Sequence, residues 1–151
     1  MATMRRARLQ AVEALPDYRL KLTFIDGSIF TVSLADAFDA FPGLNPLRDT
    51  NAFAKAAVIE GEGWTVEWPD LDIQIGADTL WLDAQAQNAP NDATRQFAGW
   101  RARHGLSLSQ AAIALGLTPR TVSAYGSGAR QVPRAVLLAL KGWEVEQAER
   151  Q

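Results

Sequence analysis

The sequence contains no cysteine and only one histidine, and both scarcities limit the chemistry that it can perform. Without cysteine there can be no disulfide framework, no thiolate metal site and no cysteine nucleophile. A serine–histidine–aspartate triad or a multi-histidine metal site would depend on His104 alone. We therefore expect no catalytic residues, no metal site and no cofactor. The missing cysteine also fits a reducing, cytoplasmic setting.

Long apolar runs are missing as well. No stretch approaches the roughly 18 to 20 apolar residues that a membrane-spanning helix requires. The N-terminal residues 1–8 are basic but lack the apolar segment of a signal peptide. We therefore expect a cytoplasmic protein that does not associate with a membrane.

The single histidine can be interpreted in two ways. His104 follows basic residues and directly precedes Gly105, which is expected to end a helix. A cationic side chain in that last turn interacts favourably with the negative end of the helix dipole. A catalytic role would need a partner group, and the sequence offers no obvious one. The structural role is therefore the favoured interpretation.

Charge is distributed unevenly along the chain. Residues 1–90 contain seven Lys or Arg against thirteen Asp or Glu, a net charge of −6. Residues 91–151 contain eight against four, a net charge of +4. This asymmetry predicts two domains with different partners, and the basic one is a candidate for binding a polyanion.

The acidic half shows mostly strand patterns. Residues 9–15 predict a first, less regular strand, and Asp26-Gly27 is typical of a tight hairpin turn before a third strand at residues 29–34. The second strand has alternating apolar residues at Tyr18, Leu20, Leu22 and Phe24. Further segments predict a helical stretch at 45–54, a strand at 57–60, a hairpin at 64–68 and 71–75, and a short helix from 76 to 82.

A polar segment separates this half from the rest of the chain. Residues 85–92, with the sequence QAQNAPND, carry a proline and no apolar period, which predicts an interdomain linker. We therefore expect an acidic domain at 1–84 and a helical domain at 93–151. The fold class is α+β: a small, mainly antiparallel β domain with short helices, followed by an all-α bundle.

The basic half predicts a first helix at residues 93–104. Its periodicity places Phe97 and Trp100 inward, and we expect Arg95, Arg101 and Arg103 to point outward.

A second helix is predicted at 108–115 and a third at 119–125. Ser107 and Gln110 form a capping-box pattern at the start of the second helix. Gly116 allows the turn, and Thr118-Pro119 occupies the first positions of the third helix. Together these segments predict a helix-turn-helix motif.

These residues resemble the phage-repressor and Cro-like helix-turn-helix family over about residues 93–143. The run 117–130, LTPRTVSAYGSGAR, is similar to the recognition helix and the Ser-Gly-x-Arg loop of that family, and 132–140 to its next helix. The sequence departs from the family at Gly126, where glutamate is frequent, and at Ala124 and Ala129, where larger polar or basic residues are common.

The resemblance implies a DNA-binding surface. Arg120 would make a bidentate contact to a guanine, with an alternative in which Arg120 and Arg130 lie on a solvated surface. Tyr125, Trp100 and Trp143 are expected in the core. Residues expected to face the major groove are Pro119, Arg120, Thr121 and Ala124. Residues expected near phosphates are Ser107, Ser109, Thr118, Ser127 and Arg130.

The N-terminal half is similar to the bacterial domain family of unknown function numbered 2442. The similarity rests on ALPDYRLKLTFIDGSIFTVSL and GWTVEWPDLDIQIGADTLWL, and spans about residues 7–84. Members are short, mainly β domains, some fused to a helix-turn-helix and some encoded beside toxin-like proteins. The resemblance implies a fold and hints at a partner-binding role, and no activity is established for that family.

Two pairs of residues in this half have alternative interpretations. Asp70 and Asp72 could form a metal or acid–base pair, but Pro69-Asp70 fits a turn and Asp72 the solvent face of a strand. Trp64 and Trp68 lie on one predicted strand face, either in the core or at an interface.

The sequence therefore predicts a DNA-binding transcriptional regulator that acts as a homodimer on double-stranded DNA. Its N-terminal domain would serve dimerisation or bind a protein partner or effector. The alternative is an antitoxin-like module whose acidic domain binds a protein partner. An enzyme is disfavoured because no nucleotide loop, metal cluster or nucleophile–base pair is visible.

Overall fold

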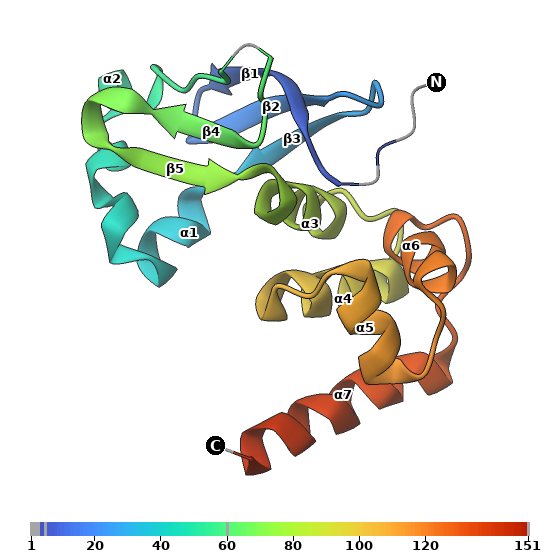
Figure 1. Cartoon of the computed structure of the whole chain (residues 1–151). Helices are drawn as coiled ribbons and strands as arrows, with labels where there is room; N and C mark the ends of the chain where they lie inside the picture. Colours follow the sequence, from blue (N-terminus) through green and yellow to red (C-terminus); the bar gives the residue numbers. More distant parts are fainter. Residues whose placement is uncertain (1–3, 5, 60, 151) are drawn as a thin grey trace. The chain divides into compact units, whose positions relative to one another are not determined.

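Three antiparallel strands open the fold, and the middle one supplies much of the core. The computed structural model describes residues 4, 6–59 and 61–150. Strand β2 (Arg19–Phe24) pairs with β1 (Leu9–Leu15) on one side and β3 (Ile29–Ser33) on the other (Figure 1). Its apolar residues Leu20, Leu22 and Phe24 are all buried, so the expected alternation is confirmed.

Short helices follow the sheet. They are α1 (Ala35–Ala40), the 3-10 helix η1 (Pro42–Arg48) and α2 (Thr50–Phe53). The single helical stretch predicted at 45–54 is split at Asp49, whose extended backbone ends η1 and whose carboxylate caps α2 by accepting from the amide of Asn51 at 2.9 Å. The predicted strand at 57–60 was wrong for residues 57–59, since only Ala57 pairs, through one bridge to Glu67. Residue 60 lies outside the described residues.

A second hairpin and a longer helix complete this part. Strands β4 (Thr65–Trp68) and β5 (Ile73–Gly76) are joined by the 3-10 turn η2 (Pro69–Leu71). Asp72 ends that turn with a φ of 52°, so it is a turn residue and not the strand residue that we expected. Helix α3 (Ala77–Gln87) extends beyond the predicted short helix and includes residues 85–87 of the predicted linker.

Aromatic packing consolidates the N-terminal core. The indole of Trp68 is buried, and its Nε1 donates to the carbonyl oxygen of Phe53 at 3.0 Å. The ring of Tyr18 meets Phe38 and Phe53 edge to face, with centroid separations of 5.0 and 5.5 Å. Edge-to-face pairs of this kind contribute beyond their apolar burial.

Helices make up the remainder of the chain, in agreement with the predicted α+β class. They are α4 (Asp92–His104), α5 (Leu108–Leu115), α6 (Pro119–Ser127) and α7 (Arg134–Glu149). Only residues 88–91 connect α3 to α4 outside helices. The chain divides into two compact units, Met1–Ala84 and Gln85–Gln151.

The core of the second unit contains the predicted aromatic residues. Phe97, Trp100 and Tyr125 are buried, and Trp143 packs against them at a centroid distance of 5.3 Å from Trp100. Arg101 differs from the expectation, because it lies inside and only 5% of it is exposed. Arg95 and Arg103 do point outward, as expected.

Among the residues described, none of the helices is both long and apolar enough to cross a lipid bilayer.

Candidate nucleic-acid interface

Helices α5 and α6 are joined by a turn of three residues, Gly116 to Thr118. Gly116 has a φ of 69°, a left-handed conformation that glycine adopts without steric cost. The amide of Leu117 donates back to the carbonyl of Ala112 at 2.9 Å, which closes the end of α5. Val122 of α6 and Ala112 of α5 share one buried cluster. This packing holds α6 against α5 and leaves the opposite side of α6 open.

That open side of α6 carries the arginine singled out from the sequence. At 100° per residue, Arg120, Ala124 and Ser127 fall within about 60° of one another around the helix. Arg120 and Ser127 are exposed and Ala124 is half-buried. The side chain of Arg120 makes no hydrogen bond or ion pair with any described residue, so its guanidinium is available to an external acceptor. Exposed Ser123 borders the same face, and its i+3 spacing from Arg120 was a signal that sequence reasoning missed.

Thr118 and Thr121 form a small polar cluster where α6 begins. The Oγ1 atom of Thr118 accepts from the amide of Thr121 at 3.2 Å and lies 3.0 Å from the Oγ1 of Thr121. Thr118 and Pro119 are exposed and Thr121 is half-buried. The first turn of a helix presents amide groups and a positive dipole end, which favour an anion.

The start of α5 has the same character. The predicted capping box is confirmed: the Oγ of Ser107 accepts from the amide of Gln110 at 3.1 Å, and the Gln110 side chain accepts from the amide of Ser107 at 3.0 Å. Ser107 and Ser109 are both exposed. The N-termini of α5 and α6 therefore both carry small hydroxyl side chains.

The loop after α6 holds Arg130 in a defined place. Its amide donates to the carbonyl of Ala124 at 3.2 Å, and its guanidinium lies 5.8 Å from the centroid of the Tyr125 ring. Gly128 ends α6 with a φ of 83°, and a Cβ there would lie 2.8 Å from the Cγ of Pro90. All nine residues that we assigned to DNA are thus on the surface or half-buried, and whether they contact DNA stays a prediction.

A buried polar cluster lies behind α6. The Nε of Arg101 donates to the carbonyl of Leu106 at 3.1 Å, and burial lowers the pKa of Arg101 to about 10. The buried Oε1 of Gln85 and Oγ1 of Thr94 have no hydrogen-bond partner among the described residues. Because no carboxylate of a described residue pairs with Arg101, its charge is poorly compensated.

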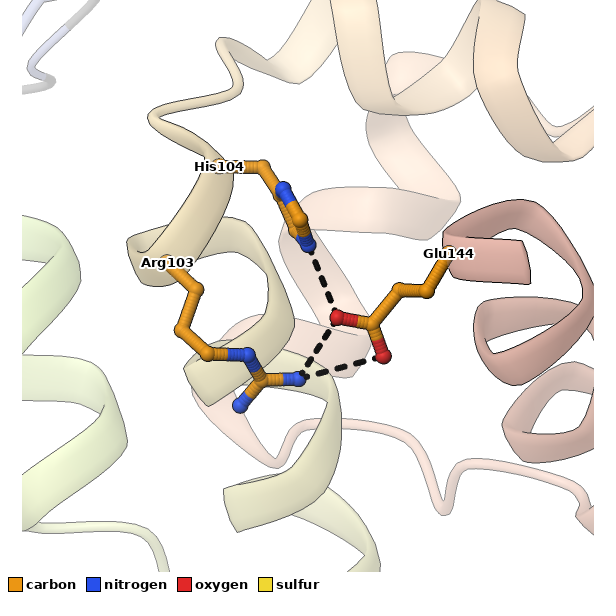
Figure 2. A network of polar contacts seen from close by, with 3 residues as sticks. All are labelled: Arg103, His104 and Glu144. Atoms are coloured by element: carbon orange, nitrogen blue, oxygen red, sulfur yellow. Dashed lines mark hydrogen bonds and ion pairs between the residues drawn. The ribbon is translucent and has the colours of Figure 1, made fainter. Parts of the chain in front are cut away.

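His104 belongs to a polar network at the end of α4, shown in Figure 2. Its Nε2 lies 2.8 Å from Oε2 of Glu144 in α7, and Arg103 bonds the same carboxylate at 3.3 Å. The hydrogen bond from His104, together with the charge of Arg103, holds the pKa of Glu144 below its usual value. His104 therefore joins α4 to α7. The described residues contain no cluster of three metal-ligating side chains.

The acids and tryptophans of the first unit occupy different environments. Asp70 pairs with Lys55 at 3.6 Å, on the surface, and Asp72 is exposed in its turn. Trp68 is in the core, whereas Trp64 is 46% exposed. The guanidinium of Arg8 lies 5.0 Å from the centroid of the Trp64 ring. The two tryptophans therefore do not form the exposed pair that would favour a binding surface.

An apolar groove of about 510 Å³ lies in the first unit. A volume of this size is typical of small-ligand sites. Asp83 of α3 is partly buried there, and burial raises the pKa of its carboxyl. Its side chain forms no hydrogen bond or ion pair with a described residue. The groove is lined by Leu34, Ala37, Phe41, Leu44, Ile75 and Asp83, among others.

The N-terminal strands and their helices correspond to a known domain family. The model of the family described as "Protein of unknown function (DUF2442)" matches residues 9–86, and the chain belongs to this family. It is also similar to a crystal structure described as a "putative DNA binding protein" from Nitrosomonas europaea, with 38% identity, a TM-score of 0.57, and coverage of 95% of this chain and 90% of that one. No curated protein matches the sequence.

Proposed function

We propose that this protein is a transcriptional regulator that binds double-stranded DNA in a sequence-specific manner. In this proposal α5 and α6 act as a helix-turn-helix of the phage-repressor type, with α6 in the major groove. The observation that carries the proposal is the exposed face of α6, where the side chain of Arg120 has no polar partner among the described residues. A guanidinium free of intramolecular bonds can contact O6 and N7 of a guanine together.

Charge and similarity support the same proposal. Residues 91–143 contain seven Lys or Arg and one acidic residue, Asp92, so this segment attracts a polyanion. The N-termini of α5 and α6 offer Ser107 and Thr118 to phosphates, which would fix the register of the protein on the duplex. The solved relative from Nitrosomonas europaea, whose similarity covers 95% of this chain, is described as a putative DNA binding protein.

The first experiment is a selection of bound sequences from a random duplex library, followed by a salt titration of the winning duplex. We expect a short palindromic motif, because one helix-turn-helix reads only a half-site and a dimer reads two. Arg120→Ala should lose about 1–3 kcal/mol of binding free energy and relax one base position in each half-site.

Arg95→Ala is the matched control, because Arg95 is also exposed but belongs to α4 and pairs with Asp92 at 3.4 Å. It should leave the selected motif unchanged. Weak, sequence-blind binding that disappears near physiological salt would contradict the proposal.

We further propose that the protein is not an enzyme and that its N-terminal domain binds a partner. The second candidate function is an antitoxin-like module, and the specific observation in its favour is the groove beside the unpaired Asp83 in an acidic domain. Co-expression with a basic protein encoded beside it would test this candidate. Such a complex should survive Arg120→Ala and weaken with Phe41→Ala, since Phe41 is an exposed residue of the groove.

A further inference from the structure

The groove of the first unit is held in shape by its own backbone and core. It is lined by residues of α1, η1, β5 and α3, whose ribbons can be followed in Figure 1. The amide of Phe41 donates to the carbonyl of Ala37 at 2.8 Å, and the amide of Leu44 donates to the carbonyl of Phe41 at 2.9 Å, which fixes the turn between α1 and η1. Leu44 and Ile75 pack against the buried core of this unit. The groove is therefore formed before a ligand arrives, as small-molecule sites usually are.

Asp83 is the charged group of this groove. The described residues that line it include no other acidic side chain and no Lys, Arg or His. The Asp83 carboxylate is partly buried and has no hydrogen bond or ion pair with a described residue, so it loses hydration that no partner replaces. Thr79 lies four residues earlier on the same side of α3, and its exposed hydroxyl also bonds no described residue. A carboxylate and a hydroxyl thus face the groove side by side, both free to bind an external donor.

We propose that this groove binds a small organic amine, whose ammonium group pairs with Asp83 while its apolar body fills the rest of the groove. A protonated amine has three donors and no acceptor, so it can bond the carboxylate and the Thr79 hydroxyl together. The ring of Phe41, 62% exposed, can cover the ligand or contact its cation. Residues 1–90 carry a net charge of −6, which attracts cations and disfavours anionic ligands. The apolar part of the lining is supplied by Leu34, Ala37, Leu44 and Ile75.

The surface around the groove favours a small molecule over a protein at this site. A stable protein interface buries about 800 Å² on each partner and surrounds its centre with further contacts. The other large apolar side chains exposed among the described residues of this unit do not line the groove; they are Ile25, Ile29, Ile59 and Trp64. A volume of about 510 Å³ with one charged group instead matches a single compact ligand.

Three probes with one apolar body test the need for a positive charge: 4-phenylbutylamine, 4-phenylbutanol and 4-phenylbutyrate. Each is titrated into the isotope-labelled full chain and followed by the shifts of backbone amides in NMR spectra. The amine should shift amides of the groove, among them those of Ala37, Leu44 and Thr79. It should bind at least about tenfold more tightly than the alcohol, because a hydrogen bond between charged groups is stronger than one to a hydroxyl. The carboxylate probe should bind most weakly of the three.

Asp83→Asn is the decisive variant, because it keeps the shape of the side chain and removes its charge. It should weaken amine binding at least about tenfold and leave the alcohol unaffected. Asp72→Asn is the matched control, since it removes one exposed carboxylate of the same unit from outside the groove lining and should leave amine binding unchanged. Equal affinity for amine and alcohol, amine binding that survives Asp83→Asn, shifts outside the groove, or no binding of the amine would each overturn the proposal.

This inference rests on the proposed partner-binding role of the N-terminal domain and not on DNA binding by α6. It competes with the antitoxin-like candidate for the same groove, and a short peptide of alternating lysine and leucine separates the two. If the peptide binds more tightly than the amine and shifts amides beyond the groove, the occupant is a basic protein and the amine proposal is overturned. Failure of the DNA selection with amine binding intact would refute the proposed regulator and support the groove site independently.

Discussion

A Cβ atom on Gly126 would lie 3.6 Å from Nη1 of Arg101, the buried arginine that pairs with no carboxylate of a described residue. It would also lie 3.1 Å from Oε1 of Gln85, an atom without a hydrogen-bond partner among the described residues. A glutamate, which the resembled family often has at this place, would therefore extend toward the Arg101 guanidinium. The glycine leaves a buried cation uncompensated directly behind α6.

We expect Gly126→Glu to stabilise the protein through an ion pair with Arg101. The gain should disappear in an Arg101→Met background, where the new carboxylate would be buried without a cation. A double-mutant cycle from urea unfolding should give a coupling free energy of about 0.5–3 kcal/mol. A coupling indistinguishable from zero would show that the two side chains do not meet.

Thr118 allows the stability of α6 to be separated from its proposed contact with DNA. Thr118→Ala removes the side-chain acceptor for the amide of Thr121 and should cost about 1 kcal/mol of unfolding free energy. Thr118→Asp keeps an N-cap acceptor and should preserve stability, but its charge should repel phosphates and reduce DNA affinity. Thermal unfolding and binding titrations should therefore rank the two variants in opposite orders. Equal DNA affinity of Thr118→Asp and the wild type would exclude Thr118 from the phosphate contacts.

The pH dependence of stability should reveal the Glu144 network. Hydrogen bonding from His104 lowers the pKa of Glu144 in the folded state, so the carboxylate stabilises the fold at pH values above the usual glutamate pKa of 4.5. This contribution is lost as the pH falls through the lowered pKa. Glu144→Gln should lower the urea midpoint at neutral pH, with the difference from wild type shrinking in acid. Glu146→Gln, which removes an exposed carboxylate of the same helix, should show no such pattern.

Asp83 should have the opposite pH dependence. Burial raises the pKa of its carboxyl, so protonation favours the folded state below the usual value of 3.8, and this contribution is lost as the pH rises through the raised pKa. Asp83→Asn should therefore raise the urea midpoint at neutral pH and give no advantage at about pH 3. Asp72→Asn is a suitable control, because Asp72 is exposed and asparagine tolerates its left-handed backbone. A lower midpoint for Asp83→Asn at neutral pH would show that the carboxylate has a stabilising partner.

Local chemistry made parts of the fold predictable from the sequence. The capping box at Ser107 and the turn at Gly116 depend on residues only a few positions apart, and both are found where they were expected. Arg101 was placed wrongly because its charge was given more weight than its spacing. It lies four residues after Phe97, so helical periodicity already assigned it to the buried face.

Features that depend on distant parts of the chain could not be predicted in the same way. The polarity of residues 85–87 predicts a linker, yet Gln85 is buried beside Gly126 and continues α3. Trp64 and Trp68 share a strand pattern, but only Trp68 finds a buried acceptor, the carbonyl of Phe53. The nine residues assigned to DNA follow from the motif and its resemblance, and experiments on Arg120 and Thr118 will decide their role.

Gly128 and Gly126, only two residues apart, should differ in how freely they mutate. Two features disfavour any side chain at position 128: its φ of 83° and the nearby ring of Pro90. Any L-residue there is therefore strained. Position 126 has helical backbone, and its nearest neighbour is the movable end of Gln85. In a saturation-mutagenesis library selected for folding, we expect glycine alone to survive at 128 and several small or acidic residues at 126. Substitution at position 126 could thus supply a counter-ion for Arg101, whereas position 128 in the adjoining loop would have to remain glycine.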